Sequence, residues 1–195
     1  MATIFNYVVN KIKERSLIFF IGLTVFLLGF LLGLFFNLPE LLKETYTNFV
    51  LEIFINVLLK KSSVFTFFFM RLLNVVLLFL IAFLLCLNGA SFFGIFLFIF
   101  YKACVLAVGV KICVITLKFL GFIPFIFTIF LESILVIFSL IIYAVLCFEN
   151  VKKLDGCFIE KHIKKTAICI LISTAGIVVA TLLLVCVFRP INFYF

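Results

Sequence analysis

Long apolar runs alternate with short polar breaks along this chain, and five of the runs are long enough to cross a membrane. A bilayer core about 30 Å thick takes about 20 apolar residues to span as a helix. The runs cover 16–36, 64–87, 92–117, 121–147 and 166–188. The pattern therefore predicts an all-α, polytopic integral membrane bundle of five transmembrane helices, with 1–195 as a single membrane domain.

The pattern between the first and second runs is that of a helix lying on a surface. Apolar residues recur at helical spacing through 38–59, while charged and amide side chains take the opposite face. This spacing predicts an amphipathic helix on the extracytoplasmic side. Two interpretations remain open: a helix that binds a partner or lies on the membrane, and a connector that covers the end of the bundle.

The charged residues stand beside the apolar runs, and they predict an orientation. The chain has 16 Lys and Arg against 8 Asp and Glu, a net charge of +8, and its two basic clusters, 11–15 and 152–165, precede the first and last runs. Because cytoplasmic loops collect Lys and Arg, both clusters predict a multi-pass protein of the cell membrane with a cytoplasmic N-terminus and an extracytoplasmic C-terminus. The lipid bilayer is the expected partner of these charges, and nucleic acid is not.

The sequence contains no motif for catalysis, for a cofactor or for a metal ion. Six of the seven cysteines fall in or at the ends of apolar runs, and no Cys-x-x-Cys or Cys/His metal spacing occurs. His162, the only histidine, lies in the basic loop and is interpreted as a solvated residue. We therefore expect a protein that is not an enzyme and uses no cofactor.

Two ionisable residues stand deep in adjacent apolar runs. Lys102 and Glu132 each lie about ten residues, or about 15 Å, from the nearer end of their run. A lone charge at the bilayer centre costs at least about 2.5–3.5 kcal/mol on insertion scales. We therefore predict a structural ion pair between Lys102 and Glu132 that holds the two helices in register, with an ion- or proton-coupling site as the alternative. Arg71, near the start of its run, is interpreted as snorkelling to the surface.

Small residues predict close helix packing. Gly29 and Gly33 form a G-x-x-x-G in the first run, which permits another helix to approach closely, although glycine is also common in membrane helices.

The third run resembles a known family. Residues 100–109 (FYKACVLAVG) are similar to the Phe-x-Lys-small-x3-small pattern of the stage II sporulation protein M family, with Lys102, Ala103 and Ala107 at the matching places. The order of parts is similar too, from the basic N-terminus and the glycine-containing anchor to the basic loop before the last span. In the fourth run the proline of the family pattern is absent, and Glu132 stands where the family has a His or Gln-like residue.

The resemblance implies a non-enzymatic membrane scaffold that anchors peptidoglycan-remodelling partners, in sporulating members during engulfment of the forespore. The expected partners are then cell-wall hydrolases or other membrane proteins, and a homo-oligomer remains open. Ala103 and Ala107 are implied helix-packing residues. The alternative function is the membrane subunit of a small-molecule or lipid exporter.

Overall fold

The computed structural model is an all-α helical bundle, and it describes residues 2–35, 63–87, 93–148 and 158–188. In chain order the elements are α1 (Ala2–Glu14), α2 (Ser16–Phe35), α4 (Val64–Leu87), α5 (Phe93–Phe125), the π-helix η2 (Ile126–Phe130), α6 (Leu131–Cys147), α7 (Phe158–Leu183) and the π-helix η4 (Leu184–Phe188). Five helical stretches of the described residues are long and apolar enough to cross a membrane. The predicted all-α bundle with five such helices is therefore confirmed, and the chain is a multi-pass membrane protein.

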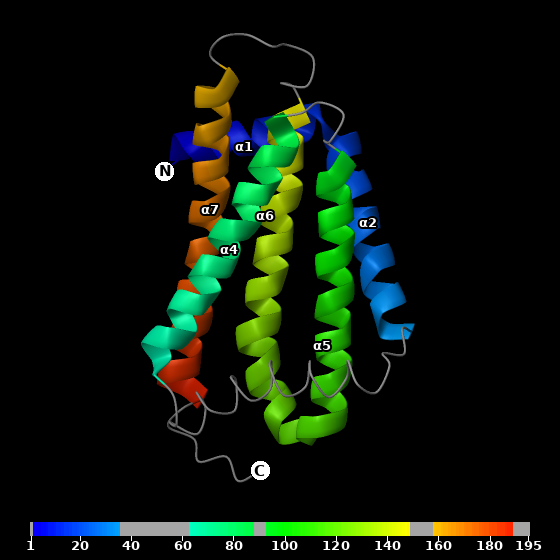
Figure 1. The fold of residues 1–195 in the computed structure, drawn as a ribbon, viewed down its shortest axis with the longest axis vertical. Coiled ribbons are helices and arrows are strands. Elements are labelled where there is room, and N and C mark those ends of the chain that lie inside the picture. The colour runs from blue at the N-terminus through cyan, green and yellow to red at the C-terminus, as the bar shows by residue number, and fades with distance from the viewer. Residues whose placement is uncertain (1, 36–62, 88–92, 149–157, 189–195) are drawn as a thin grey trace.

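The five long helices run up and down the bundle, and α6 lies at its centre (Figure 1). Its side chains fill much of the core, among them Leu140, Tyr143 and Ala144, none of which has exposed surface. The ring of Phe79 on α4 meets that of Tyr143 edge to face, with centroids 6.0 Å apart. Because α6 is held from several sides, the polar residues near its start have fixed neighbours.

Helix α1 is an element that the sequence pattern does not predict. It lies across the end of the bundle at which α2, α5 and α7 begin (Figure 1). Arg15, directly after α1, donates a hydrogen bond of 2.9 Å from Nη1 to the carbonyl oxygen of Val145. A cation at the C-terminal end of α6 satisfies a carbonyl group that has no partner within its own helix. The basic N-terminal segment is thus positively charged and also forms a structural contact with the end of α6.

Two further boundaries differ from the prediction. Helix α7 begins at Phe158 rather than at 166, and its charged first turns are supported by the pair of Glu160 and Lys164, 2.7 Å apart at i and i+4. The backbone also stays helical through the bend between α5 and α6, where η2 follows Pro124. Thr128 there donates a hydrogen bond of 2.6 Å to the carbonyl oxygen of Pro124. The predicted amphipathic helix 38–59 lies outside the described residues.

Helices α2 and α5 cross at very close range. A Cβ atom added at Gly29 would lie 3.1 Å from the Cβ of Ala103, and one added at Gly33 would lie 2.8 Å from the Cβ of Ala107. Either added atom would also lie 2.6 Å from a carbonyl oxygen of α5. Cys104 Sγ donates a hydrogen bond of 3.0 Å to the carbonyl oxygen of Gly29 across this crossing. The structure therefore brings all four predicted helix-packing residues to a single contact, which sets the position of α5.

Candidate functional site

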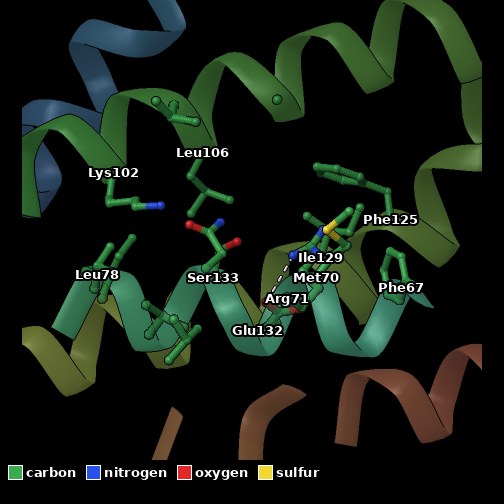
Figure 2. Close-up of a pocket in the computed structure, with 16 residues that line it drawn as sticks. Phe67, Met70, Arg71, Leu78, Lys102, Leu106, Phe125, Ile129, Glu132 and Ser133 are labelled. Atoms are coloured by element: carbon green, nitrogen blue, oxygen red, sulfur yellow. Dashed lines mark hydrogen bonds and ion pairs between the residues drawn. The ribbon is translucent and has the colours of Figure 1, made fainter. Parts of the chain in front are cut away.

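A cavity of about 530 Å³ lies between α4, α5, η2 and α6, within the stretches that could cross a membrane. Its charged residues come from α4, α5 and α6, and Figure 2 shows them pointing into one space. The lining residues are Phe67, Met70, Arg71, Asn74, Val75, Leu78, Lys102, Val105, Leu106, Gly109, Phe125, Ile129, Glu132, Ser133, Val136 and Ile137. Most of this lining is apolar, and its polar side chains are few and close together.

The carboxylate in the cavity belongs to Glu132 and is paired with Arg71. The Nη1 atom of Arg71 lies 3.0 Å from Oε1 of Glu132, whose side chain is only 5% exposed. The guanidinium carbon of Arg71 also lies 5.1 Å from the centre of the Phe67 ring, one turn earlier on α4. A cation over an aromatic face is attracted by the electrons of the ring. Arg71 therefore has two contacts that hold it inside the bundle.

This geometry corrects two interpretations of the sequence. The ion pair of Glu132 is with Arg71 of α4 and not with Lys102 of α5, and Arg71 does not snorkel to the surface. The physical reason is that Arg71 lies on the face of α4 that lines the cavity, together with Val75 and Leu78. From that face a long, planar guanidinium can reach the carboxylate while Phe67 supports it.

Lys102 lines the same cavity, and Figure 2 shows it extending from α5 toward the space that Ser133 borders. Within the described part of the chain it forms no ion pair and no hydrogen bond. The lining thus carries two cationic side chains and one carboxylate, a net charge of +1. Asn74 and Ser133 add groups that can donate hydrogen bonds.

The cavity opens at the surface of the bundle beside α4. Met70 and Asn74 both line the cavity and are both exposed, and Met70 has 62% of its surface accessible. Helix α4 packs mainly on α7, whereas α5 packs mainly on α2, so the contact between α4 and α5 is slight. Since α4 and α5 are both long and apolar enough to cross a membrane, the opening lies where lipid would surround the protein.

The interpretation of His162 as a solvated residue is wrong. Its side chain has no exposed surface, and its Nδ1 atom lies 3.5 Å from Sγ of Cys147. Because α7 starts before His162, the helix carries the ring into the interface with α4 and α6, where the Phe83 ring lies 6.3 Å away. Across the described residues, no group of three or more His, Cys, Asp or Glu side chains is placed to hold a metal ion.

Sequence reasoning thus found two residues of the cavity, Lys102 and Glu132, but assigned Arg71 to the surface and gave Asn74 and Ser133 no place in a site. The signal that was available is the spacing of Arg71 and Asn74, three residues apart in an otherwise apolar run, which places both on one helix face. Such a polar face inside a membrane helix indicates a protein-lined interior. No protein-family model, no curated protein and no solved structure matches this chain.

Proposed function

We propose that the protein binds a small molecule or lipid within the membrane, as the membrane subunit of an exporter does. The observation that carries this proposal is the cavity itself, about 530 Å³ in volume and lined by Arg71, Lys102 and Glu132. Binding sites for small molecules are typically cavities of this size, mostly apolar, with a few polar groups that fix the ligand's orientation. Ionisable residues inside membrane helices concentrate at such sites because they are costly elsewhere.

A purely structural role explains the charges less well. Arg71 and Glu132 alone suffice to hold α4 against α6 through a neutral pair. Lys102 adds a further cation at a cost of at least about 2.5–3.5 kcal/mol on insertion scales, and it does not take part in that pair. A cation kept at this cost beside an open cavity favours a function in binding.

Blocking the cavity tests the proposal. Leu106 lines the cavity and is 5% exposed, so Leu106→Trp should fill part of it, whereas Leu97 on the same helix is 70% exposed and lies outside the lining. Native mass spectrometry of the protein, released from membranes in mild detergent, should show a bound small molecule or lipid on the wild type and on Leu97→Trp. The bound mass should be lost from Leu106→Trp. Identical bound masses on all three proteins would refute the proposal.

We also propose that the protein lies in the cell membrane with its N-terminus in the cytoplasm. The support is the charge at the end of the bundle where α1 lies and α7 begins (Figure 1). Helix α1 carries Lys11 and Lys13 in its last turn, and α7 carries Lys164 and Lys165 before its apolar part. Basic residues gather on the cytoplasmic side of membrane proteins.

The scaffold function implied by the resemblance to the stage II sporulation protein M family stays a prediction. The helix expected to bind its partners, 38–59, lies outside the described residues. Crosslinking from that segment tests it: capture of cell-wall hydrolases would favour the scaffold, whereas capture of an ATPase subunit through the cytoplasmic loop alone would favour the exporter.

A further inference from the structure

The charge of the cavity indicates what kind of ligand it accepts. Arg71 and Glu132 form an ion pair at 3.0 Å, so the lining, which also contains Lys102, has one positive charge in excess. In a region of low dielectric constant an uncompensated cation strongly favours an anion beside it. Asn74 and Ser133, which also line the cavity, offer N–H and O–H donors to the oxygens of such an anion. One negative charge on the ligand would bring the cavity to neutrality.

The remainder of the lining favours a ligand that also has an apolar part. Beyond the polar side chains the wall is made of aliphatic and aromatic groups, including Leu78, Leu106 and Phe125. A small hydrated anion would contact only the polar part of this wall. An alkyl chain can cover the apolar part at little cost, because it passes from one apolar environment, the bilayer, into another. The combination of one cation and a long apolar wall thus fits an amphiphile.

The opening indicates where the ligand comes from. The exposed side chains of Met70 and Asn74 mark the mouth of the cavity on α4, in a stretch of helix that could cross the membrane. An amphiphile dissolved in the bilayer can enter there without passing through water. A free anion would first have to cross the hydrocarbon region at a high energetic cost.

We infer that the ligand is a membrane amphiphile with a singly charged anionic headgroup, held by Lys102, with an alkyl chain along the apolar wall of the cavity. This inference rests on the proposed binding function and names its ligand class. Helix packing places Lys102 for this task, because the neighbouring residues Ala103 and Ala107 fix α5 against α2. Lys102 is then a binding residue, and the pair of Arg71 and Glu132 forms the neutral wall beside it.

The absence of tryptophan from the chain permits a clean fluorescence test. Phe67 lines the cavity and is 5% exposed, so a Phe67→Trp reporter should be reached by a cavity ligand and hardly by the surrounding lipid. The full-length variant is placed in vesicles of phosphatidylcholine. We then add a fixed mole fraction of brominated lipid, either phosphatidylglycerol or phosphatidylcholine. The bromine atoms on the chains quench tryptophan on contact. Brominated phosphatidylglycerol should quench the tryptophan fluorescence at least threefold more strongly than brominated phosphatidylcholine.

A matched pair of lysine variants provides the control. Lys102→Gln in the reporter background should lower quenching by brominated phosphatidylglycerol to the level of phosphatidylcholine. Lys111→Gln, on the same helix but outside the lining, should leave it unchanged. Should Phe67→Trp fail to fold, the reporter moves to Phe125→Trp, which also lines the cavity and is 1% exposed.

Each other outcome has a definite meaning. Strong but equal quenching by both lipids would overturn the anionic headgroup while leaving the binding function intact. Quenching by neither lipid would overturn both the ligand class and lipid binding in the cavity. Loss of the phosphatidylglycerol signal on addition of millimolar inorganic phosphate would overturn the amphiphile and indicate a free anion instead.

Discussion

Replacing Gly33 by alanine should loosen the crossing of α2 and α5 and destabilise the protein. The added Cβ atom would lie 2.6 Å from the carbonyl oxygen of Cys104 and 2.8 Å from the Cβ of Ala107. Carbon atoms in good contact are about 3.5–4.0 Å apart. Neither neighbour can rotate away, since one is backbone and the other is the first atom of a side chain. The two helices must therefore separate.

The size of the effect follows from these distances. The helices must move apart by about 0.7 Å or more at this point to restore an ordinary carbon–carbon contact. Overpacking of this kind typically costs about 1–3 kcal/mol, and the better helix propensity of alanine returns at most about 1 kcal/mol. Because the closest contact is with backbone, the cost should lie in the upper part of that range, at about 2–3 kcal/mol. The net loss is then about 1–2 kcal/mol, which for a chain of this length lowers the melting temperature by about 2–8 °C.

Thermal unfolding of the purified protein, followed by size-exclusion chromatography after heating, measures this shift. Gly94→Ala on α5 is the matched control, because the nearest atoms to its Cβ would be the two Cδ atoms at the end of the Leu85 side chain, at 3.2 Å. Adding Ala107→Gly to Gly33→Ala should restore only part of the loss, since the contact with the carbonyl oxygen of Cys104 persists. If Gly33→Ala melts at the temperature of Gly94→Ala, the close crossing is not a feature of the protein.

Two further predictions concern the charges. Glu132→Gln leaves Arg71 and Lys102 as two cations in one cavity, so it should destabilise the protein by about 3–5 kcal/mol. It should lower the melting temperature more than Arg71→Met does, because in Arg71→Met the charge of Lys102 still balances that of Glu132. Equal losses of stability in the two single variants, with a loss in the double variant equal to their sum, would contradict the pairing. For the orientation, a membrane-impermeant maleimide applied to intact cells should label a cysteine introduced at Asn48 much faster than Cys157. Equal rates would contradict a cytoplasmic N-terminus.

The number of spans was predictable because it depends on one length scale. A helix must be about 20 apolar residues long to cross a bilayer, and the five runs meet this condition whatever their contacts. Helix ends at the membrane surface follow no such rule. The segments with Lys11 and with Glu160 are polar enough to be loops, and they are helical in the structure. Hydrogen bonds and local ion pairs stabilise these helix ends. One example is the hydrogen bond that Arg15 donates to the carbonyl oxygen of Val145.

The partner of Glu132 could not be found from depth alone. Depth along a helix leaves the direction of each side chain undetermined, and a long side chain such as that of Arg71 can reach inward as well as outward. The helical bend through Pro124 and η2 also moves the start of α6 along the chain, to Leu131 rather than 121. His162 shows the same limit, since only the earlier start of α7 turns it toward Cys147. Both errors concern direction, which requires the packed structure.

The ten residues that carry the family resemblance combine two tasks on different faces of α5. Ala103 and Ala107, four residues apart, lie against the glycines of α2. Lys102, Leu106 and Gly109, at spacings of four and three residues, face the cavity. Because both sets sit on one helix, a side chain added on the α2 side moves α5, and the lysine with it, away from α2. Packing at Gly33 and binding at Lys102 are thus linked through α5, so Gly33→Ala should weaken binding even where the protein still folds.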